Sequence, residues 1–132
     1  MSSEVQGSSP AWRWLGIEMV DAADGSATVE MTPSGDMANH SGFVHGGMIT
    51  ALADSAMGRC LRTLAPGVVR AMSFDLKLNF ISAAKVGETL RATGHVIHSG
   101  RRTAVTECRV VGPDGRLVAT ASGTFAITRE KE

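Results

Sequence analysis

The sequence is poor in cysteine and carries neither an excess charge of one sign nor a long apolar run. Cys60 and Cys108 are its only cysteines, so neither a disulfide framework nor a cysteine-based metal cluster is expected. Basic and acidic residues both number 13, which gives no electrostatic signal for nucleic acid or an anionic membrane. No apolar run approaches the roughly 18 residues that a membrane span requires. These absences predict a cytoplasmic protein in a reducing setting, with no nucleic acid or membrane as its partner.

Other absences narrow the expectation further. The first residues lack the basic start and apolar core of a secretory signal, so no leader is expected. His40, His95 and His98 have no ligand spacing with one another or with cysteine, so no metal site is expected. The chain of 132 residues contains neither a repeat nor a linker, and it is long enough for a real core. We therefore expect a flexible N-terminus over 1–10 and a single domain over 11–132.

What the sequence does contain is concentrated in residues 39–60, which read NHSGFVHGGMITALADSAMGRC. Their apolar periodicity predicts a helix from about Gly46 to about Leu61, followed by a Pro- and Gly-containing stop at 65–67. Such a helix is normally buried. The glycines that start it cost helix stability and the carboxylate of Asp54 costs desolvation energy, which indicates a functional role. The residues predicted to be buried recur at steps of three and four: Ile49, Leu52, Ala53, Ala56, Met57, Cys60 and Leu61.

The remainder reads mainly as strands separated by short turns. Residues 11–17 are expected to form a short helical turn or an extended lead-in, and 33–41 a polar loop. Between 72 and 80, alternation predicts a strand whose buried face holds Met72, Phe74, Leu76, Leu78 and Phe80. Short turns favour antiparallel neighbours. The expected fold class is α+β, a curved antiparallel sheet of about five strands wrapped around the helix. The other predicted strands cover 27–31, 89–98, 103–111 and 117–127.

The central helix also carries the candidate chemistry. A helix N-terminus presents free N–H groups and partial positive charge, so Gly46 and Gly47 can stabilise a developing oxyanion. Asp54, desolvated among buried neighbours, is a candidate general base or nucleophile. The structural alternatives are a tight turn or close helix packing for the glycines and a surface carboxylate for Asp54. Gly46 and Asp54 lie roughly 12 Å apart along one helix, too far to serve one carbonyl. An active site would therefore be shared between two antiparallel copies in a dimer.

One motif in this stretch matches a known family signature. It reads Asn39-x-x-Gly42-x-x-His45-Gly46-Gly47, followed by Leu52-Ala53-Asp54. It resembles the signature of hotdog-fold thioesterases of the phenylacetate-pathway (PaaI-like) type, and the match continues through 73–87, the turn at 100–102 and the closing hairpin. The resemblance implies a hotdog fold, dimers paired into homotetramers, and hydrolysis of acyl-coenzyme A to free acid and coenzyme A without a further cofactor.

The resemblance also implies roles for individual residues. The Gly46 amide would polarise the thioester carbonyl, Asp54 of the partner chain would act on it, and Asn39 would orient water or the attacking group. His45 would hold the thioester or the loop. Ser73 would assist near the carboxylate, although the alternation of its strand places it opposite the apolar face.

Several weaker candidates remain open. Arg101 and Arg102 follow a glycine turn, where relatives place basic groups near coenzyme A phosphates; exposed turn arginines are the alternative. A hotdog hydratase or dehydratase would share the fold, but its Asp–His or His–Glu patterns are absent. A non-catalytic acyl-CoA-binding module would have no need of a buried carboxylate. Candidates for an acyl pocket, or for core, are Trp12, Trp14, Met48, Met57 and Phe74.

Overall fold

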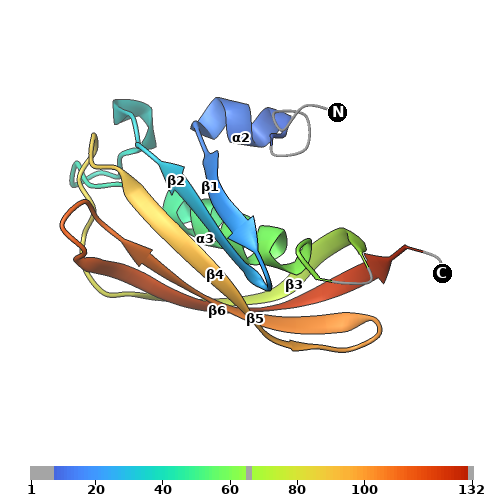
Figure 1. Cartoon of the computed structure of the whole chain (residues 1–132). Coiled ribbons are helices and arrows are strands. Elements are labelled where there is room, and N and C mark those ends of the chain that lie inside the picture. The colour runs from blue at the N-terminus through green and yellow to red at the C-terminus, as the bar shows by residue number, and fades with distance from the viewer. Residues whose placement is uncertain (1–7, 65–66, 131–132) are drawn as a thin grey trace.

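The computed structural model of the protein describes residues 8–64 and 67–130. Six strands form one antiparallel sheet in the order β1-β2-β4-β5-β6-β3, and the sheet curves around helix α3 (Figure 1). The α+β prediction is confirmed, with one strand more than expected. Within the described ranges, no helix has the length and apolar character needed to cross a membrane. The elements are α2 (Pro10–Leu15), β1 (Glu18–Ala23), β2 (Ser26–Met31), η1 (Gly35–Met37), α3 (Gly46–Leu61), β3 (Val68–Phe80), β4 (Leu90–Ser99), β5 (Thr103–Val111) and β6 (Leu117–Arg129).

Helix α3 spans the predicted residues, and all seven residues expected on its buried face are buried. It packs most closely on β4, where a side chain at Gly94 would place a Cβ only 2.8 Å from the Ala56 carbonyl oxygen. Glycine at this position lets the helix approach the sheet. The stop predicted for this helix lies partly at 65–66, outside the described residues.

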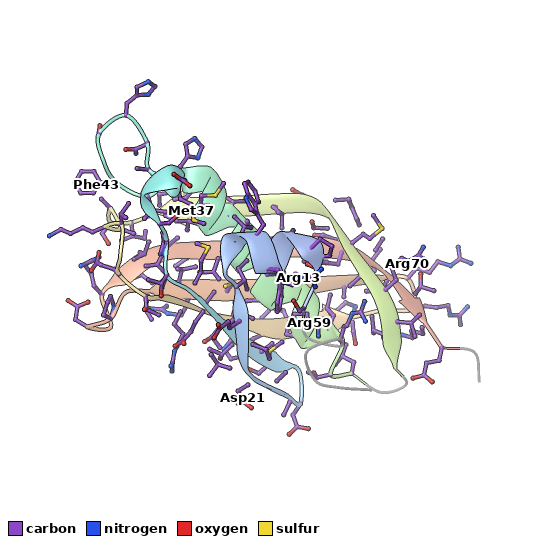
Figure 2. All side chains as sticks on the ribbon, turned by 90° about the horizontal axis from the view of Figure 1, so that it is seen from above. Arg13, Asp21, Met37, Phe43, Arg59 and Arg70 are labelled. Carbon is purple, nitrogen blue, oxygen red and sulfur yellow. The ribbon has the colours of Figure 1, made fainter. Side chains whose placement is uncertain are left out.

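Two elements near the N-terminus were not fully predicted. The lead-in at 11–17 is largely the short helix α2, which is capped by Ser9 and ended by Gly16 in a left-handed conformation, φ 75°. Strand β1, which the sequence did not predict, follows it and turns back at Asp24-Gly25 into β2. Seen from above, α2 lies over α3 (Figure 2). It therefore covers part of the helix surface that the sheet leaves open.

The predicted buried face of β3 is wrong in part. Met72 and Phe74 are 62% and 64% exposed, whereas Ser73 between them is half-buried. Phe80, which was also predicted on the buried face, is 55% exposed. The cause at Met72 and Phe74 is a bulge in the pairing with β6 between Ser73 and Asp75, because an extra residue reverses the alternation that follows it. Ser73 therefore points inward before the bulge, as Leu76 and Leu78 do after it.

Candidate active site

The N-terminus of α3 is organised by His45. Its ring nitrogen Nδ1 accepts a hydrogen bond of 2.8 Å from the backbone N–H of Gly47, so His45 is the N-cap. Because Nδ1 accepts this hydrogen bond, a neutral imidazole carries its proton on Nε2. The Nε2–H is then a second donor, not used in capping the helix. In the described part of the chain, no group accepts a hydrogen bond from the N–H of Gly46. Gly46 is thus the available donor, whereas the N–H of Gly47 is already engaged.

The ring of Phe80 lies against Gly46. A Cβ at this glycine would come within 3.2 Å of Phe80 Cζ. The ring is 55% exposed although it makes this contact, because β3 is an edge strand. Phe80 therefore provides an apolar surface beside Gly46 at the start of the helix.

Asn39 shapes the loop before the helix. Its side-chain oxygen Oδ1 accepts hydrogen bonds from the backbone N–H of Ser41, at 2.9 Å, and of Phe43, at 3.1 Å. Since the oxygen is used within the loop, the carboxamide NH₂ is the part of Asn39 left to meet a substrate or water. The exposed side chains of Asn39 and His45 stand at the same end of α3 as Gly46.

Asp54 lies in the middle of α3 and is half-buried. Burial raises the pKa of its carboxyl above the ordinary 3.8, and hydrogen bonding with Ser73 opposes that rise. The bulge in β3 is what turns Ser73 toward the helix. A desolvated carboxylate with a raised pKa is a stronger base than one in water.

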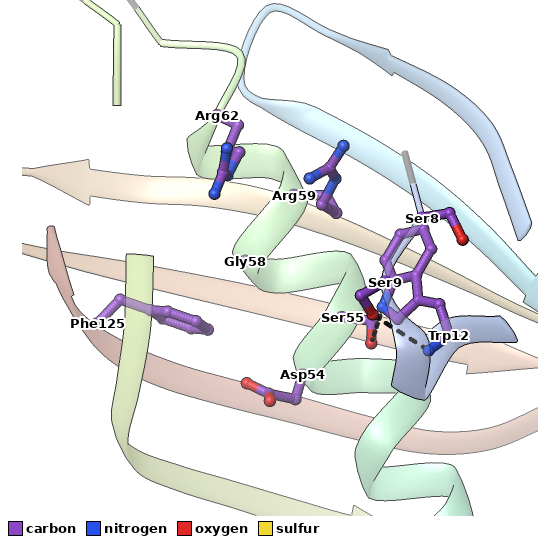
Figure 3. A pocket seen from close by; sticks show the side chains of 9 residues that line it. All are labelled: Ser8, Ser9, Trp12, Asp54, Ser55, Gly58, Arg59, Arg62 and Phe125. Atoms are coloured by element: carbon purple, nitrogen blue, oxygen red, sulfur yellow. Dashed lines mark hydrogen bonds between the residues drawn. The ribbon is translucent and has the colours of Figure 1, made fainter. Parts of the chain in front are cut away.

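A cavity of about 240 Å³ opens beside Asp54 (Figure 3). Helix α2 forms one side of it, because the indole N–H of Trp12 donates to Ser55 Oγ at 3.0 Å. The guanidinium of Arg59 lies 5.5 Å from the Trp12 ring centroid, within the range of a cation–π contact. The cavity thus joins a carboxylate to an aromatic wall and two cationic side chains. Its lining residues are Ser8, Ser9, Trp12, Asp54, Ser55, Gly58, Arg59, Arg62 and Phe125.

A second hollow of about 290 Å³ adjoins the helix N-terminus, with His45, Met48 and Trp14 in its lining. Of the proposed acyl-pocket residues, Trp12 therefore lines the cavity at Asp54, and Trp14 and Met48 line this one. Met57 is fully buried in the core, and Phe74 is exposed on β3.

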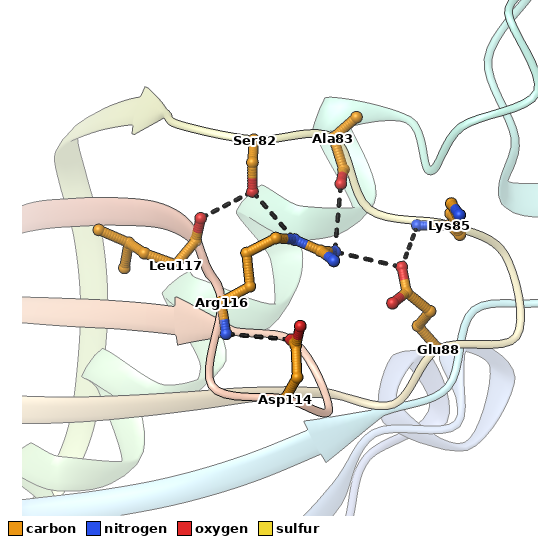
Figure 4. Close-up of polar contacts among 7 residues, drawn as sticks. All are labelled: Ser82, Ala83, Lys85, Glu88, Asp114, Arg116 and Leu117. Atoms are coloured by element: carbon orange, nitrogen blue, oxygen red, sulfur yellow. Dashed lines mark hydrogen bonds and ion pairs between the residues drawn. The ribbon is translucent and has the colours of Figure 1, made fainter.

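A polar network joins residues 82–88, next to the loop 38–45, to the turn between β5 and β6 (Figure 4). Arg116 donates to Ser82 Oγ, to the Ala83 carbonyl and to Glu88, and so fastens residues 82–88 to the β5–β6 turn. The Val44 N–H then donates to the Ala84 carbonyl at 2.9 Å, next to the N-cap. The residue before the N-cap is therefore bonded to a segment that the Arg116 network holds.

The last two candidates from the sequence, Arg101 and Arg102, do not line the cavity at Asp54. Arg101 and Arg102 are exposed in the turn between β4 and β5. Their turn adjoins the row Ala104–Phe125–Ser73 that crosses three adjacent strands. At about 4.8 Å per strand, Ala104 stands roughly 10 Å from Ser73. Both arginines are thus near the Asp54 side of the sheet, in an outer position.

Of the residues that line the Asp54 cavity, sequence reasoning singled out only Trp12 and Asp54. Ser55 and Arg59 on α3, and Arg62 at its C-cap, recur at steps of four and three next to Asp54, so their shared face was visible in the sequence. What was not visible was that α2 folds over this face and closes it into a cavity.

The fold and the candidate site indicate one class of protein, and comparisons with known proteins indicate the same class. Residues 41–119 match the family model of the thioesterase superfamily. The chain belongs to this superfamily and is an enzyme with the hotdog thioesterase fold, so the predicted family and fold are confirmed.

Individual relatives are more specific. The chain is 30% identical over 109 residues to the acyl-coenzyme A thioesterase PaaI of Escherichia coli, covering 83% of this chain and 76% of that protein. It is 34% identical over 112 residues to human acyl-coenzyme A thioesterase 13, covering 82% and 77%. Among solved structures, conserved protein PA5202 of Pseudomonas aeruginosa superposes with a TM-score of 0.88 at 31% identity, covering 96% and 100%. A Streptococcus mutans protein bound to acetyl CoA gives 0.79 at 28% identity, covering 88% and 91%.

Proposed function

We propose that the protein hydrolyses acyl-coenzyme A thioesters to a free acid and coenzyme A. The observation that carries this proposal is the pairing of a free N–H at Gly46 with a half-buried carboxylate at Asp54, both on one helix. The names of the relatives, and the acetyl CoA bound to one of them, support the substrate class. The reaction needs only water and substrate, without a further cofactor or metal.

In this mechanism, the Gly46 N–H and the positive end of the α3 dipole bind the thioester carbonyl oxygen and stabilise it as it becomes an oxyanion. Asp54 acts in one of two ways. As a general base, it takes a proton from the water that adds to the carbonyl carbon; the C–S bond then breaks and the thiolate receives that proton. As a nucleophile, it displaces the thiolate to form a mixed anhydride, which water hydrolyses. The NH₂ of Asn39 and the Nε2–H of His45 orient the thioester or the water.

The two groups must come from different chains. They are eight residues apart in the continuous helix α3, about 12 Å at 1.5 Å per residue. We propose a homodimer in which antiparallel α3 helices bring Gly46 of one copy to Asp54 of the other. Edge strand β3 supports this arrangement, because it is 13 residues long and exposes apolar side chains beside the helix. Pairing of dimers into tetramers and a cytoplasmic location complete the proposal.

Thiol release from a panel of acyl-CoAs tests the activity, with Asp54→Asn as the critical variant. We expect a loss of about 10²–10⁴-fold in kcat, the usual contribution of a positioned base. Asp21→Asn, an exposed carboxylate on β1, is the control and should retain full activity. Retained activity in Asp54→Asn would remove the proposed role, and ligand binding without any hydrolysis would favour a binding module.

Gly46→Pro tests the oxyanion donor alone. Gly46 is the first helical residue, where proline is well tolerated, and His45 before it already has the extended conformation that proline requires, φ −63° and ψ 136°. The substitution therefore removes the N–H and keeps the helix. Gly46→Ala, which makes a similar contact with Phe80 but retains the N–H, is the matched control. We expect about 10²–10³-fold lower kcat for the proline variant only.

Mixing the two inactive variants tests the shared site. Heterodimers of Asp54→Asn and Gly46→Pro chains contain one intact site and should recover part of the activity. Heterodimers verified by mass that show no recovery would mean that both groups act within one chain.

A further inference from the structure

Gly58 is a costly residue in the second half of α3. It lies inside the helix, four residues before the C-cap at Arg62. Apart from proline, glycine is the least favourable residue at such a position, because it loses the most backbone freedom on folding. The other glycines of this helix, Gly46 and Gly47, stand at its start and belong to the candidate oxyanion site. That role does not extend to Gly58, three turns further on.

Close packing does not require glycine at position 58. Among the described residues, an added Cβ would come nearest to Cε2 of Phe125, beyond its own helix backbone, at an ordinary contact distance of 3.6 Å. Gly94 on β4 differs, because a Cβ there would lie 2.8 Å from the Ala56 carbonyl oxygen. Alanine therefore fits at position 58 in the single chain and would strengthen the helix.

The space beside Gly58 is the cavity at Asp54 (Figure 3). Gly58 follows Asp54 by four residues, so the two positions are neighbours on one face of α3, one turn apart. A side chain at position 58 would project into the space next to the carboxylate. Glycine thus keeps the cavity of about 240 Å³ open on this side.

The walls near Gly58 suit an apolar group. The rings of Trp12 and Phe125 line the cavity, and the Trp12 indole is fixed by its hydrogen bond to Ser55 Oγ. Ser55 Oγ in turn donates to a carbonyl one turn back in α3, at 2.7 Å, and Ser9 Oγ accepts from the Trp12 backbone N–H at 3.1 Å. Both hydroxyls are used in holding the helices, so the aromatic surfaces are what remains for a ligand.

We propose that Gly58 determines which acyl groups the enzyme accepts. In this arrangement the thioester lies at Asp54, and an apolar acyl chain runs over Gly58 along the Trp12 and Phe125 rings. This inference rests on the proposed thioester hydrolysis and adds the residue that sets the size of the acyl group. Burial of the methylene groups against the two rings stabilises the bound chain.

The pantetheine arm of coenzyme A is the other part of the substrate next to the thioester. It carries two amide groups, which need hydrogen-bond partners when they are buried. The Phe125 ring offers none, and the indole N–H of Trp12 is already engaged by Ser55. Methylene groups match these surfaces better, and the experiment separates the two parts of the substrate.

Gly58→Ala separates a ligand role from a packing role. We expect the melting temperature to rise by about 2–5 °C, because alanine favours the helix and fits the space. The ratio of kcat/KM for hexanoyl-CoA to that for acetyl-CoA should nevertheless fall about 3–10-fold, since the added methyl group occupies room that the longer chain needs. Gly94→Ala, at a glycine that packing requires, is the comparison and should lower the melting temperature instead.

Gly58→Leu should enlarge the effect on specificity. Acyl-CoAs from acetyl to decanoyl are compared, and the chain length with the highest kcat/KM should become shorter by about three or four carbons. Each carbon added to the side chain displaces about one carbon of the substrate in a close-packed site. Ala126→Leu, which adds bulk on the exposed face of β6 next to Phe125, is the matched control and should keep the wild-type profile.

Other results would overturn this inference. A lower melting temperature or a smaller assembly for Gly58→Ala would show that the glycine serves packing, within the chain or against a second copy. An unchanged acyl profile in both variants would place the acyl chain elsewhere and leave the proposed function intact. Equal losses on all CoA thioesters that vanish with acyl-N-acetylcysteamine thioesters would place the pantetheine arm over Gly58. If the wild-type protein hydrolysed no thioester, the proposed function itself would be wrong.

Discussion

The two edges of the sheet are built differently. Strand β1 is a six-residue edge with the acidic side chains of Glu18 and Asp21 and an irregular register between Met19 and Asp21. Short, charged and irregular edges resist pairing with another chain. Strand β3, at the opposite edge, has 13 residues and exposes Met72 and Phe74. The fold thus protects one edge and leaves the other suited to association.

The difference also bears on catalysis, because β3 carries groups of the candidate site. Ser73 interacts with Asp54, and Phe80 packs on Gly46. A partner that pairs with β3 would therefore arrive next to both halves of the proposed site. Strand β1 contributes no residue to the cavity at Asp54. Changes at the two edges should consequently have unequal effects.

The largest effect is expected from a charge placed on the β3 edge. Phe74→Asp should dissociate the dimer, since it puts a carboxylate into an apolar interface. If the site is shared, activity should fall about 100-fold or more because the catalytic groups are no longer aligned. Sedimentation and thiol-release assays measure the two losses together.

Val20→Asp, the equivalent charge on exposed β1, is the control for this prediction. It should leave both the mass of the assembly and the activity unchanged. Dissociation by Val20→Asp, or a Phe74→Asp protein that remains a dimer, would reverse the assignment of the edges.

A smaller effect is expected where β3 touches the carboxylate. Hydrogen bonding from Ser73 lowers the pKa of Asp54 against the rise caused by burial. Ser73→Ala should therefore raise that pKa further, so the ionised form appears only at higher pH. The acid limb of the kcat/KM profile should move toward higher pH, with a loss of about 3–10-fold on its slope. Ser122→Ala, an exposed serine on β6, should leave the profile in place; an unmoved acid limb in Ser73→Ala would mean that Ser73 does not act on Asp54.

The edges also show what the sequence could predict. Helix α3 and its buried residues were predicted correctly, because the apolar periodicity is long and local. Strand β1 was missed, since most of its residues are exposed and carry no period-two pattern. The inward turn of Ser73 was missed because the bulge depends on pairing with β6, which lies about 50 residues away in the sequence.

The residues of the candidate site also differ in how far the sequence alone could identify them. Gly46 and Asp54 stand out in the sequence by residue type and helical spacing alone. Asn39, His45 and Ser73 required the family resemblance, because no local pattern assigns a role to them. Arg59 and Arg62 required the fold, since only the docking of α2 through Trp12 closes their face of α3 into a cavity.

The smallest effect is expected from removing either of two arginine–glutamate pairs, one near each edge of the sheet. Arg116 binds Glu88 at 3.2 Å and also donates to Ser82 and the Ala83 carbonyl, just beyond the end of β3. Among the described residues, Arg91 finds a side-chain partner in Glu30 alone, at 2.6 Å, between β4 and β2 on the β1 side. An isolated exposed pair contributes little, whereas a network that fixes a loop contributes more.

Arg116→Ala should therefore lower the melting temperature by about 3–6 °C, and Arg91→Ala by about 0–2 °C. Because residues 82–88 support the loop that carries Asn39 and His45, Arg116→Ala should also raise KM, which Arg91→Ala should not. Thermal unfolding and steady-state kinetics on the two variants measure both differences. Equal changes in melting temperature would show that the network adds nothing to the pair, and the support of the helix N-terminus would then have to come from the backbone bridge between Val44 and Ala84 alone.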